Sequence, residues 1–462
     1  MPTQTQTQAA TAPLVPSKQA LQLPTLKGLR AAGAAEYDDE LAFYETTLRA
    51  AEGDAGLVLS HLEVAPGCNV GDNFSSIVTR TTAQGTRGSG EAFQRSMIVK
   101  RTPQTDQFRC LAAFAKETDA YCGLVPTLRS LCERARLPLP LAGCLHASRT
   151  LRPDHIILED LTTLGYSMRP RQQGMDLQHA LLIMEALGRF HGASLALRRL
   201  DARTFLELRA DTSELIFFPA AEAVFACSLR ASTTMAALSL RQSGRADLAQ
   251  RLQARAARTG VFQEMCAVVA PPADGDVVPG VFTHGDCWAN NLLFKYGPGG
   301  APCQTRLVDL AGIRYSSPAL DLLHFLYTSV QRDVRLRHHD DLLQRYLRTL
   351  RATVRELVRA NAADAPLDPS LRRGAADDED DVFSEEQLKE EMRKRAAFGL
   401  WIGLWMLPAI FFSPDIVPSS DSDSPVDYFS EETQAHMCKA LPREFHRRLL
   451  HLVEDHAEDG TL

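Results

Sequence analysis

The segment HGDCWANNLLF, residues 284–294, is the part of this chain that says most about its fold. Within it, Asp286 stands two positions after His284 and five before Asn291. An apolar run follows, then the turn sequence GPGG, then a second apolar run that ends at Asp309. Two such runs around a Gly/Pro turn predict a β-hairpin. A hairpin of this length returns Asp309 to the neighbourhood of Asn291.

These residues have the offsets of the catalytic loop HxDxxxxN of kinases, followed by a second carboxylate. We therefore predict that Asp286 accepts the proton of a substrate hydroxyl, and that Asn291 and Asp309 supply oxygen ligands to Mg²⁺. HxD alone often arises by chance, with a buried Asp that caps a loop as the alternative, but the complete set is much rarer. We expect His284 to shape the loop by packing and hydrogen bonding rather than to act as a base.

The composition is that of a globular protein. The 462 residues are enough for two or three domains, and 45% are hydrophobic and 23% charged. The 50 basic and 57 acidic residues give a net charge of −7 at pH 7. Because a nucleic-acid-binding surface needs an excess of basic groups, we predict no nucleic-acid partner. An anionic nucleotide is still compatible, since bound Mg²⁺ and a few lysines reverse the field locally.

The ten cysteines include no CxxC pair and no close pairing with histidine. This pattern favours neither a zinc site nor a disulfide framework. The N-terminal residues lack a basic stretch followed by an apolar core, so we expect no secretory signal. We predict a cytoplasmic, reduced protein that acts as a monomer.

One apolar segment requires a choice between two interpretations. Residues 396–412, AAFGLWIGLWMLPAIFF, are 17 uncharged residues that include Pro408 and two glycines. This length is at the lower limit for spanning a bilayer. We predict a buried core helix here and no membrane span, with a span as the alternative.

The first third of the chain predicts a small antiparallel sheet with one helix. Residues 1–26 are rich in Thr, Gln, Pro and Ala, which predicts a disordered tail. We assign 27–160 to an N-terminal lobe that anchors ATP. Apolar patterning predicts strands at 57–64, 74–82, 93–101 and 155–161, and a helix that starts near Phe114.

The remainder, 161–462, predicts a larger and mainly helical lobe, so the fold class is α+β. Asp176 is expected to cap a helix that begins at the next residue. Pro, Gly and the acidic run DDEDD predict a solvated loop at 362–383. Ser384 and Gln387 then predict a capping box that restarts a helix.

A phosphotransferase also needs groups that hold the ATP phosphates. Lys100 ends the predicted strand SMIVK and Glu117 lies in the next predicted helix, where kinases carry their phosphate-anchoring pair. A Lys at a strand end is more often a solvated charge, but the HGD constellation favours the functional role. The sequence GDNFSS, with Asn73 and Ser75, predicts a turn whose N–H groups face the phosphates.

Several motifs together resemble those of the ecdysteroid kinase-like family, which is related to choline and aminoglycoside phosphotransferases. They are HGDCWANNLLF, SSPALDLLHFL, IILEDL, GRFHGASLALR, ETDAYCGLVP and FGLWIGLWMLP. The resemblance covers about residues 55–450. It implies a protein kinase-like two-lobed fold, ATP and Mg²⁺ as cofactors, and a small alcohol, often a steroid, as substrate.

By position, the resemblance implies that Asp286 is the base, Asn291 and Asp309 the metal ligands, and Lys100 and Glu117 the phosphate-anchoring pair. These are the same assignments that the spacing supports.

The resemblance further implies that the segment from Glu159 to Leu161 binds adenine through its backbone, and that Asp321 supports the catalytic loop. One departure is evident. Where the family commonly has Asp-Phe-Gln, this chain reads Asp-Leu-Ala. Leu310 can replace the phenyl ring in packing, but Ala311 supplies no amide, which affects the expected geometry of the loop or substrate rather than the metal ligand.

We predict an ATP-dependent small-molecule kinase that phosphorylates a hydroxyl of an ecdysteroid or a similar lipophilic compound. The alternatives are a detoxifying or choline/aminoglycoside-type phosphotransferase, and a catalytically silent binding protein with the same fold. A choline-type substrate would require acidic or aromatic groups around its cation. Trp288, Trp401 and Trp405 are candidate pocket residues, with core packing as the alternative.

Overall fold

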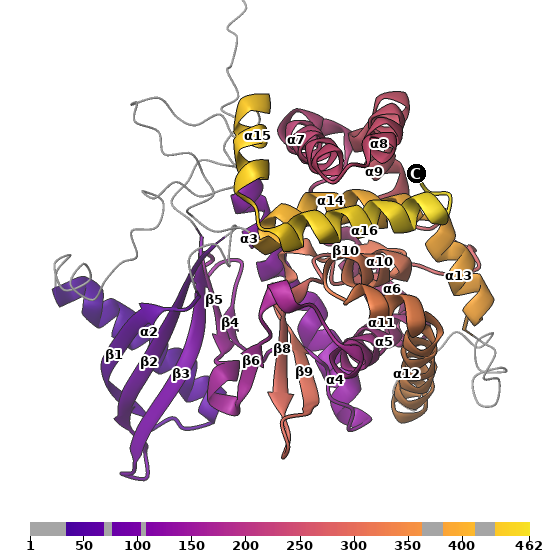
Figure 1. Ribbon diagram of the computed structural model, residues 1–462. Helices are drawn as coiled ribbons and strands as arrows, with labels where there is room; N and C mark the ends of the chain where they lie inside the picture. The colour runs from indigo at the N-terminus through magenta and orange to yellow at the C-terminus, as the bar shows by residue number, and fades with distance from the viewer. Residues whose placement is uncertain (1–33, 69–75, 103–107, 363–381, 412–429) are drawn as a thin grey trace, which may run out of the picture.

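The computed structural model describes residues 34–68, 76–102, 108–362, 382–411 and 430–462. Figure 1 shows an antiparallel sheet, built from the first part of the chain, beside a larger assembly of helices. This is the predicted α+β arrangement. The predicted tail and nearly all of the predicted acidic loop lie outside the described residues.

The main sheet has five antiparallel strands within the described residues, in the order β1-β2-β3-β5-β4. Along β2, Thr79, Thr81 and Ala83 are buried and the residues between them less so, as expected where one face of a sheet packs on a core. Lys100 lies on β3 and pairs with residues of both β2 and β5, which holds its backbone on either side. The strands are β1 (Val58–Pro66), β2 (Ile77–Thr86), β3 (Ala92–Arg101), β4 (Cys144–Ala147) and β5 (His155–Glu159).

The predicted strands are confirmed, with shifted ends. The strand predicted at 74–82 is observed from Ile77 to Thr86, because its ladder with β3 continues as far as the pairing of Thr86 with Ala92. The strand predicted to reach Leu161 ends at Glu159. The sequence analysis missed β4 and α2 (Ala34–Glu52), whose Tyr44 and Leu48 pack into the core of the sheet.

The helix that follows β3 begins earlier than predicted and is interrupted. It consists of α3 (Phe108–Asp119), a π-helical segment η2 (Ala120–Leu124) and α4 (Val125–Arg134). A π-helical segment widens the helix locally and is often found near functional sites. Here it directly follows the part of α3 that carries Glu117.

The predicted hairpin at the catalytic loop is confirmed. The strands β8 (Leu292–Tyr296) and β9 (Pro302–Leu307) pair antiparallel, and β6 (Tyr166–Met168) adds to the other edge of β8. The backbone N–H of Val308 donates to the carbonyl of Asn291 at 3.1 Å. The hairpin therefore brings Asp309, the next residue, beside Asn291. A separate two-stranded ladder joins β7 (Val281–Thr283) to β10 (Arg314–Ser316).

Two long helices, α5 (Leu177–Leu200) and α12 (His339–Asn361), pack against each other in the helical part. Gly188 and Gly192 lie on one face of α5, four residues apart. A Cβ at these positions would lie 2.6 Å from the carbonyl oxygen of Tyr346 and 2.8 Å from that of Leu350. The two glycines thus allow the helix backbones to approach closely.

Two predicted helix starts are confirmed. The carboxylate of Asp176 accepts a hydrogen bond from the N–H of His179 and caps α5. Ser384 and Gln387 form the reciprocal capping box of α13. The remaining helices are η3 (Leu161–Leu164), η4 (Arg171–Gln173), α6 (Ala202–Ala210), η5 (Pro219–Ala221), α7 (Glu222–Gln242), α8 (Ala246–Thr259), α9 (Val261–Val269), η6 (Ala289–Asn291), η7 (Leu310–Gly312), α10 (Pro318–Thr328), α11 (Arg332–Arg337), α13 (Glu385–Lys394), α14 (Ala396–Phe411), α15 (Glu431–Ala440) and α16 (Arg443–Glu458).

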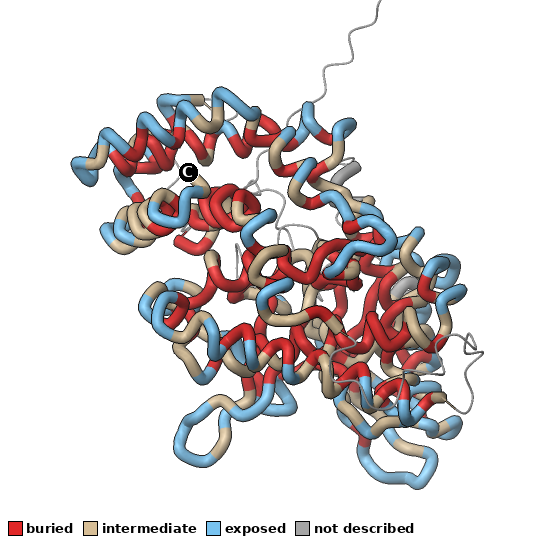
Figure 2. Tube along the Cα trace, turned by 90° about the vertical axis from the view of Figure 1, so that its right-hand side faces the viewer, coloured by how far each residue is buried: buried red, intermediate tan, exposed pale blue. Residues whose placement is uncertain are grey.

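The apolar segment that begins at residue 396 forms α14, which lies in the interior against α10 and α16 (Figure 1). Figure 2 shows buried residues concentrated where the helices face one another. Two other described helices, spanning Leu177–Leu200 and Pro219–Gln242, are long and apolar enough to cross a membrane by length and composition. Of their most apolar windows, 78% and 61% are buried inside the protein, as in core helices.

Candidate active site

The catalytic loop joins β7 to β8, and one amide holds its carboxylate. Asn291 donates from Nδ2 to the main-chain oxygen of Asp286 at 2.9 Å and to its Oδ2 at 2.8 Å. The two hydrogens of one amide nitrogen are thereby used, and the amide oxygen is left to face other groups. The fixed spacing of five residues thus produces a locked carboxylate beside an available amide oxygen.

His284 shapes this loop, as predicted. Its Nε2 lies 3.0 Å from the carbonyl oxygen of Val308, to which it donates, and its Nδ1 accepts from the N–H of Asp286 at 3.3 Å. The two contacts require a neutral ring with its proton on Nε2. Burial lowers the pKa of His284, which favours that form. The ring therefore ties the loop to the end of the hairpin and is not placed to take a proton from a substrate.

Asp321, on α10, accepts hydrogen bonds from the backbone of the catalytic loop. Its two carboxylate oxygens accept from the backbone N–H groups of His284 at 2.6 Å and Gly285 at 2.9 Å, and Oδ2 also contacts Nε2 of His191 at 3.1 Å. Burial would raise the pKa of this carboxyl, but these hydrogen bonds and the attraction to His191 and His284 lower it to about 2. Asp321 is 1% exposed, so it acts as structural support, as the resemblance implied.

Gly285 has a conformation and a close contact that only glycine tolerates. Its φ is +80°, and a Cβ there would lie 1.8 Å from the carbonyl oxygen of Gly312. Gly312 follows Asp309 by three residues, so the absence of a side chain at Gly285 lets the catalytic loop pack directly on the segment that carries the second carboxylate.

Lys100, Glu117 and Asp309 meet at the junction of the sheet and the helical part. The Nζ of Lys100 lies 2.5 Å from Oε2 of Glu117 and 3.3 Å from Oδ1 of Asp309. The other oxygen of Glu117 accepts from the N–H of Leu310 at 3.1 Å. Burial opposes the charge of Lys100, but attraction to both carboxylates outweighs it and raises its pKa. The predicted Lys–Glu pair is therefore present, and it also connects to Asp309.

Asp309 adopts a left-handed backbone conformation, with φ of +69°, that is unusual for a residue other than glycine. Its side chain accepts from the N–H of Ala311 and so caps η7. Such conformations are found preferentially at functional sites because the surrounding structure must maintain them. Leu310 is 0% exposed and packs in the main hydrophobic core.

The pKa of Asp286 is raised to about 7. Burial by the surrounding protein is the main cause, and the negative charge of Asp309 adds to it, while hydrogen bonds from Asn291 and Trp288 oppose the shift. A carboxyl near this value exchanges a proton readily at neutral pH. Of its side-chain surface, 37% is still exposed, so a substrate hydroxyl can reach it.

The donor atoms here fit a magnesium ion. Asn291 presents an amide oxygen and Asp309 a carboxylate, and Mg²⁺ prefers oxygen ligands and commonly takes one or two from protein. Within the described residues, no group of three or more His, Cys, Asp or Glu side chains could hold a metal ion. The expected magnesium site does not require such a group, because it would use one carboxylate and one amide oxygen together with oxygens of the ATP phosphates.

The predicted adenine-binding segment lies next to this cluster. Glu159 pairs with Met97 on β3, three residues before Lys100, and Leu161 packs in a small apolar cluster with Val308 at its edge. The side chain of Glu159 accepts from the N–H of Gly143 at 2.6 Å. This carboxylate is thus engaged within the protein, and the binding of adenine by the backbone of this segment stays a prediction.

Asp160, between these two residues, was not singled out by the sequence analysis. Its carboxylate accepts from Arg80 at 2.8 Å, from Ser96 at 2.7 Å and from the N–H of Thr162 at 3.1 Å. These bonds tie the connection after β5 to strands β2 and β3. A lone Asp after an apolar strand gave no signal for this role.

Other predicted residues have different outcomes. Asn73 and Ser75 lie outside the described residues. Trp401 is 1% exposed and donates from its indole nitrogen to Glu264 at 2.8 Å, so it belongs to the core. Trp405 packs against Phe217 and Phe225.

The sequence analysis missed two buried polar residues near the catalytic loop. Arg314, on β10, is 4% exposed and contacts Glu214 at 2.9 Å, and its guanidinium lies 5.7 Å from the ring centre of Phe398. His324, on α10, packs edge-on against the same ring. His324 lies within the motif SSPALDLLHFL, but the motif gave no role for it, and the packing of β10, α10 and α14 brings it close to Arg314.

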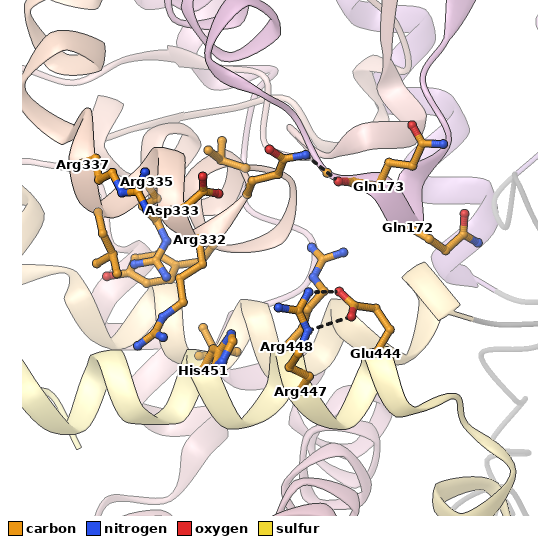
Figure 3. A pocket seen from close by; sticks show the side chains of 16 residues that line it. Gln172, Gln173, Arg332, Asp333, Arg335, Arg337, Glu444, Arg447, Arg448 and His451 are labelled. Atoms are coloured by element: carbon orange, nitrogen blue, oxygen red, sulfur yellow. Dashed lines mark hydrogen bonds and ion pairs between the residues drawn. The ribbon is translucent and has the colours of Figure 1, made fainter.

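A cavity of about 640 Å³ lies elsewhere, between η4, α10, α11 and α16 (Figure 3). Its arginines are largely engaged with protein groups: Arg332 and Arg335 contact Asp455, and Arg447 contacts Glu444. None of the predicted site residues lines it. It is therefore separate from the cluster around Asp286.

Comparisons with known proteins were made by sequence and by structure. A search of curated proteins found no match. Among solved structures, an ethanolamine kinase of Plasmodium vivax is 13% identical over 84% of each chain, with a TM-score of 0.36. An aminoglycoside phosphotransferase of Alicyclobacillus acidocaldarius is 18% identical over 70% of this chain and 89% of its own, with a TM-score of 0.30. Likenesses this weak carry no argument about function.

The family profile is decisive. The profile of the ecdysteroid kinase-like family matches residues 70–359, well over half of the chain. That span holds strands β2 to β5 of the sheet, the Lys–Glu pair, the catalytic loop and the hairpin. The sheet and the helical remainder are the two lobes of a kinase-like fold. The chain belongs to the ecdysteroid kinase-like family, a family of kinase-like small-molecule phosphotransferases.

Proposed function

We propose that this protein is an ATP- and Mg²⁺-dependent kinase that transfers the γ-phosphoryl group to a hydroxyl of an ecdysteroid or a similar hydroxylated lipophilic compound. One observation carries the proposal: Lys100 contacts both Glu117 and Asp309, while Asn291 binds Asp286. Residues from β3, α3, the catalytic loop and the end of the hairpin thus form one continuous site. A packed core alone gives no reason to gather four charged groups at the junction of two lobes.

Phosphoryl transfer depends mainly on positioning and on charge stabilisation. In the proposed reaction, Lys100 holds the ATP phosphates, and Glu117 keeps its ammonium group in place. The oxygens of Asn291 and Asp309 would hold Mg²⁺, which supplies positive charge that offsets the negative charge developing on the phosphates. The backbone of Glu159 to Leu161 binds the adenine base.

Asp286 orients the substrate hydroxyl and accepts its proton as the oxygen attacks. The bond between Asn291 and Oδ2 fixes the carboxylate plane, so that Oδ1 can receive the hydroxyl. A carboxyl whose pKa lies near neutrality suits this task, since it is ionised often enough to act and basic enough to accept the proton.

An uncharged acceptor is favoured over a cationic one by Arg314 and Phe398. A binding site for choline or an amino sugar needs acidic groups or free aromatic faces. Near Asp286, the face of Phe398 is already engaged by Arg314, and Glu214 is paired with the same guanidinium. The positive charge of Arg314 also acts on Asp286 and would repel a cation there.

We further propose a cytoplasmic monomer that acts on a small molecule, without a nucleic-acid partner or membrane span. Eight cysteines of the described residues are free thiols, as expected in a reducing compartment: Cys122, Cys132, Cys144, Cys227, Cys266, Cys287, Cys303 and Cys438. The main test of the function is incubation of purified protein with Mg²⁺-ATP and a panel of ecdysteroids, other hydroxylated lipophiles, choline and aminoglycosides. Phosphorylated ecdysteroid, identified by mass, is expected. Product from choline or amino sugars alone would reject the substrate class, and no product from any compound would favour a silent binding protein.

A further inference from the structure

His324 is a buried imidazole with no hydrogen bond among the described residues. It lies on α10 with 2% exposure, and neither Nδ1 nor Nε2 has a partner. Burying an unpartnered polar group opposes folding, so each such group calls for an explanation. The Oδ1 atom of Asp286 lies 3.9 Å from Nε2 of His324.

The two oxygens of Asp286 face different neighbours. Oδ2 is held at 2.8 Å by Asn291, whereas Oδ1 faces the ring of His324 across a gap too long for a hydrogen bond. Hydrogen bonds of catalytic groups are often long before substrate binds and shorten in the reactive complex. A shift of about 1 Å would bring Nε2 and Oδ1 to bonding distance.

The surroundings keep the His324 ring uncharged. Burial lowers its pKa to about 3, and although Asp321 opposes this, the positive charge of Arg314 acts in the same direction. A neutral imidazole still has one N–H to donate. A neutral donor orients the carboxylate of Asp286 without adding a positive charge to that of Arg314. A further positive charge would lower the pKa of the carboxyl and make it a weaker base.

We propose that His324 is a positioning residue for phosphoryl transfer: its Nε2–H bonds to one lone pair of Oδ1 of Asp286 in the reactive complex, which leaves the other lone pair for the substrate hydroxyl. Together with Asn291 on Oδ2, this bond fixes the orientation of the carboxylate. This inference rests on the proposed function, because it presupposes that Asp286 is the base. Phe398 fixes the ring orientation, since the two rings pack edge-on with centres 6.2 Å apart.

Two substitutions separate this role from simple core packing. His324→Phe preserves an aromatic ring of similar shape and removes both nitrogens. His324→Gln places an amide nitrogen near the position of Nε2 and so restores the donor. His456→Phe is the matched control, because His456 is also fully buried but stacks on Tyr327, away from Asp286.

The measurement is steady-state turnover with Mg²⁺-ATP and an ecdysteroid, together with urea unfolding of each variant. We expect His324→Phe to lower kcat by about 10-fold to 100-fold, the loss typical of a misoriented catalytic group, with KM for ATP within about twofold. Its unfolding midpoint should be unchanged or higher, because an unpartnered polar group has been removed. His324→Gln should recover most of kcat, and His456→Phe should leave kcat unchanged.

The possible failures are distinguishable. If the wild type turns over and Asp286→Asn does not, but His324→Phe has wild-type kcat, the positioning role is wrong and the proposed function stands. A Gln variant no better than the Phe variant would likewise overturn the role of the N–H donor. If the wild type phosphorylates no acceptor in the panel, the proposed function fails and the role of His324 fails with it.

Discussion

A single amide nitrogen, Nδ2 of Asn291, donates to both the main-chain oxygen and Oδ2 of Asp286, at 2.9 and 2.8 Å. The proposed base and the proposed metal ligand are therefore parts of one hydrogen-bonded unit. A substitution that removes the amide of Asn291 removes both of these hydrogen bonds to Asp286. The amide oxygen of Asn291 makes neither bond and is the atom proposed to bind the metal. This unit also explains why the spacing between the two residues is informative. At an offset of five positions, the short helix η6, which ends at Asn291, brings the amide of Asn291 back to Asp286.

The first prediction concerns Asp286→Asn. The variant can still accept the bond from Asn291, so the loop should keep its shape, but it cannot accept a proton. We expect turnover to fall by roughly 10² or more, while ATP affinity stays nearly unchanged. Nucleotide titration and product formation should both be measured. Asp333→Asn, an exposed carboxylate outside this cluster, is the control and should have wild-type turnover. Unchanged turnover in Asp286→Asn would remove this residue from the mechanism.

The second prediction concerns Asp309→Ala. Loss of the carboxylate should abolish turnover and the Mg²⁺-dependent part of ATP affinity, while metal-free nucleotide still binds through the segment after β5. Calorimetric titration of ATP with and without Mg²⁺ measures both effects. If the variant binds Mg²⁺-ATP and turns over like the wild type, Asp309 is not a metal ligand.

The third prediction uses the buried pair of Lys100 and Glu117, which are 5% and 1% exposed. Lys100→Met leaves Glu117 buried without its cation and should lower the free energy of unfolding by about 3 kcal/mol. Adding Glu117→Gln removes the stranded charge but keeps an acceptor for the N–H of Leu310. We expect the double variant to regain most of the stability and none of the turnover, as measured by urea unfolding and product formation. Recovery of activity would show that the pair serves stability alone.

The fourth prediction is a pH dependence of stability that comes from Asp321. Its pKa is lowered to about 2 in the folded protein, from an ordinary value of 3.8, so the folded state binds the proton more weakly than the unfolded state. The resulting stabilisation is fully present above about pH 5 and is lost as the pH falls toward 2. It amounts to about 2 kcal/mol. In urea unfolding, the difference between the wild type and Asp321→Asn should be constant from pH 6 to about pH 5 and should shrink from there to pH 3. A difference that is constant over this range would contradict the shifted pKa.

The fifth prediction concerns Gly285→Ala. The added Cβ meets the carbonyl of Gly312 and also requires φ of +80° in a residue other than glycine. Gly90→Ala is the matched control, because Gly90 has φ of +88° but nothing within 4 Å of the added Cβ. The control should lose about 1 kcal/mol of stability from the conformation alone. Gly285→Ala should lose clearly more and also lose turnover. Equal effects in the two variants would show that the close approach of the two segments is unimportant.

The catalytic loop and the hairpin were predictable because their geometry is local. The offset between Asp286 and Asn291, and the turn that returns Asp309, are properties of a short continuous segment. Helix starts at Asp176 and Ser384 were predictable for the same reason, since a capping side chain bonds to an N–H only a few residues away. The pair of Lys100 and Glu117 could be inferred only because the catalytic-loop pattern favoured a kinase-like arrangement, in which a strand lysine pairs with a glutamate of the next helix.

What the sequence by itself determined is therefore the set of local units: the strands, the capped helices and the loop that holds Asp286. Only the tertiary structure decided which units meet. The pairing of Arg314 with Phe398 and the placement of His324 near Asp286 each join segments that packing alone brings into contact. The physical reason is the separation of the residues along the chain. Hydrogen bonds within a turn follow from residue spacing, whereas contacts between distant segments depend on how β10, α10 and α14 pack together in the protein core.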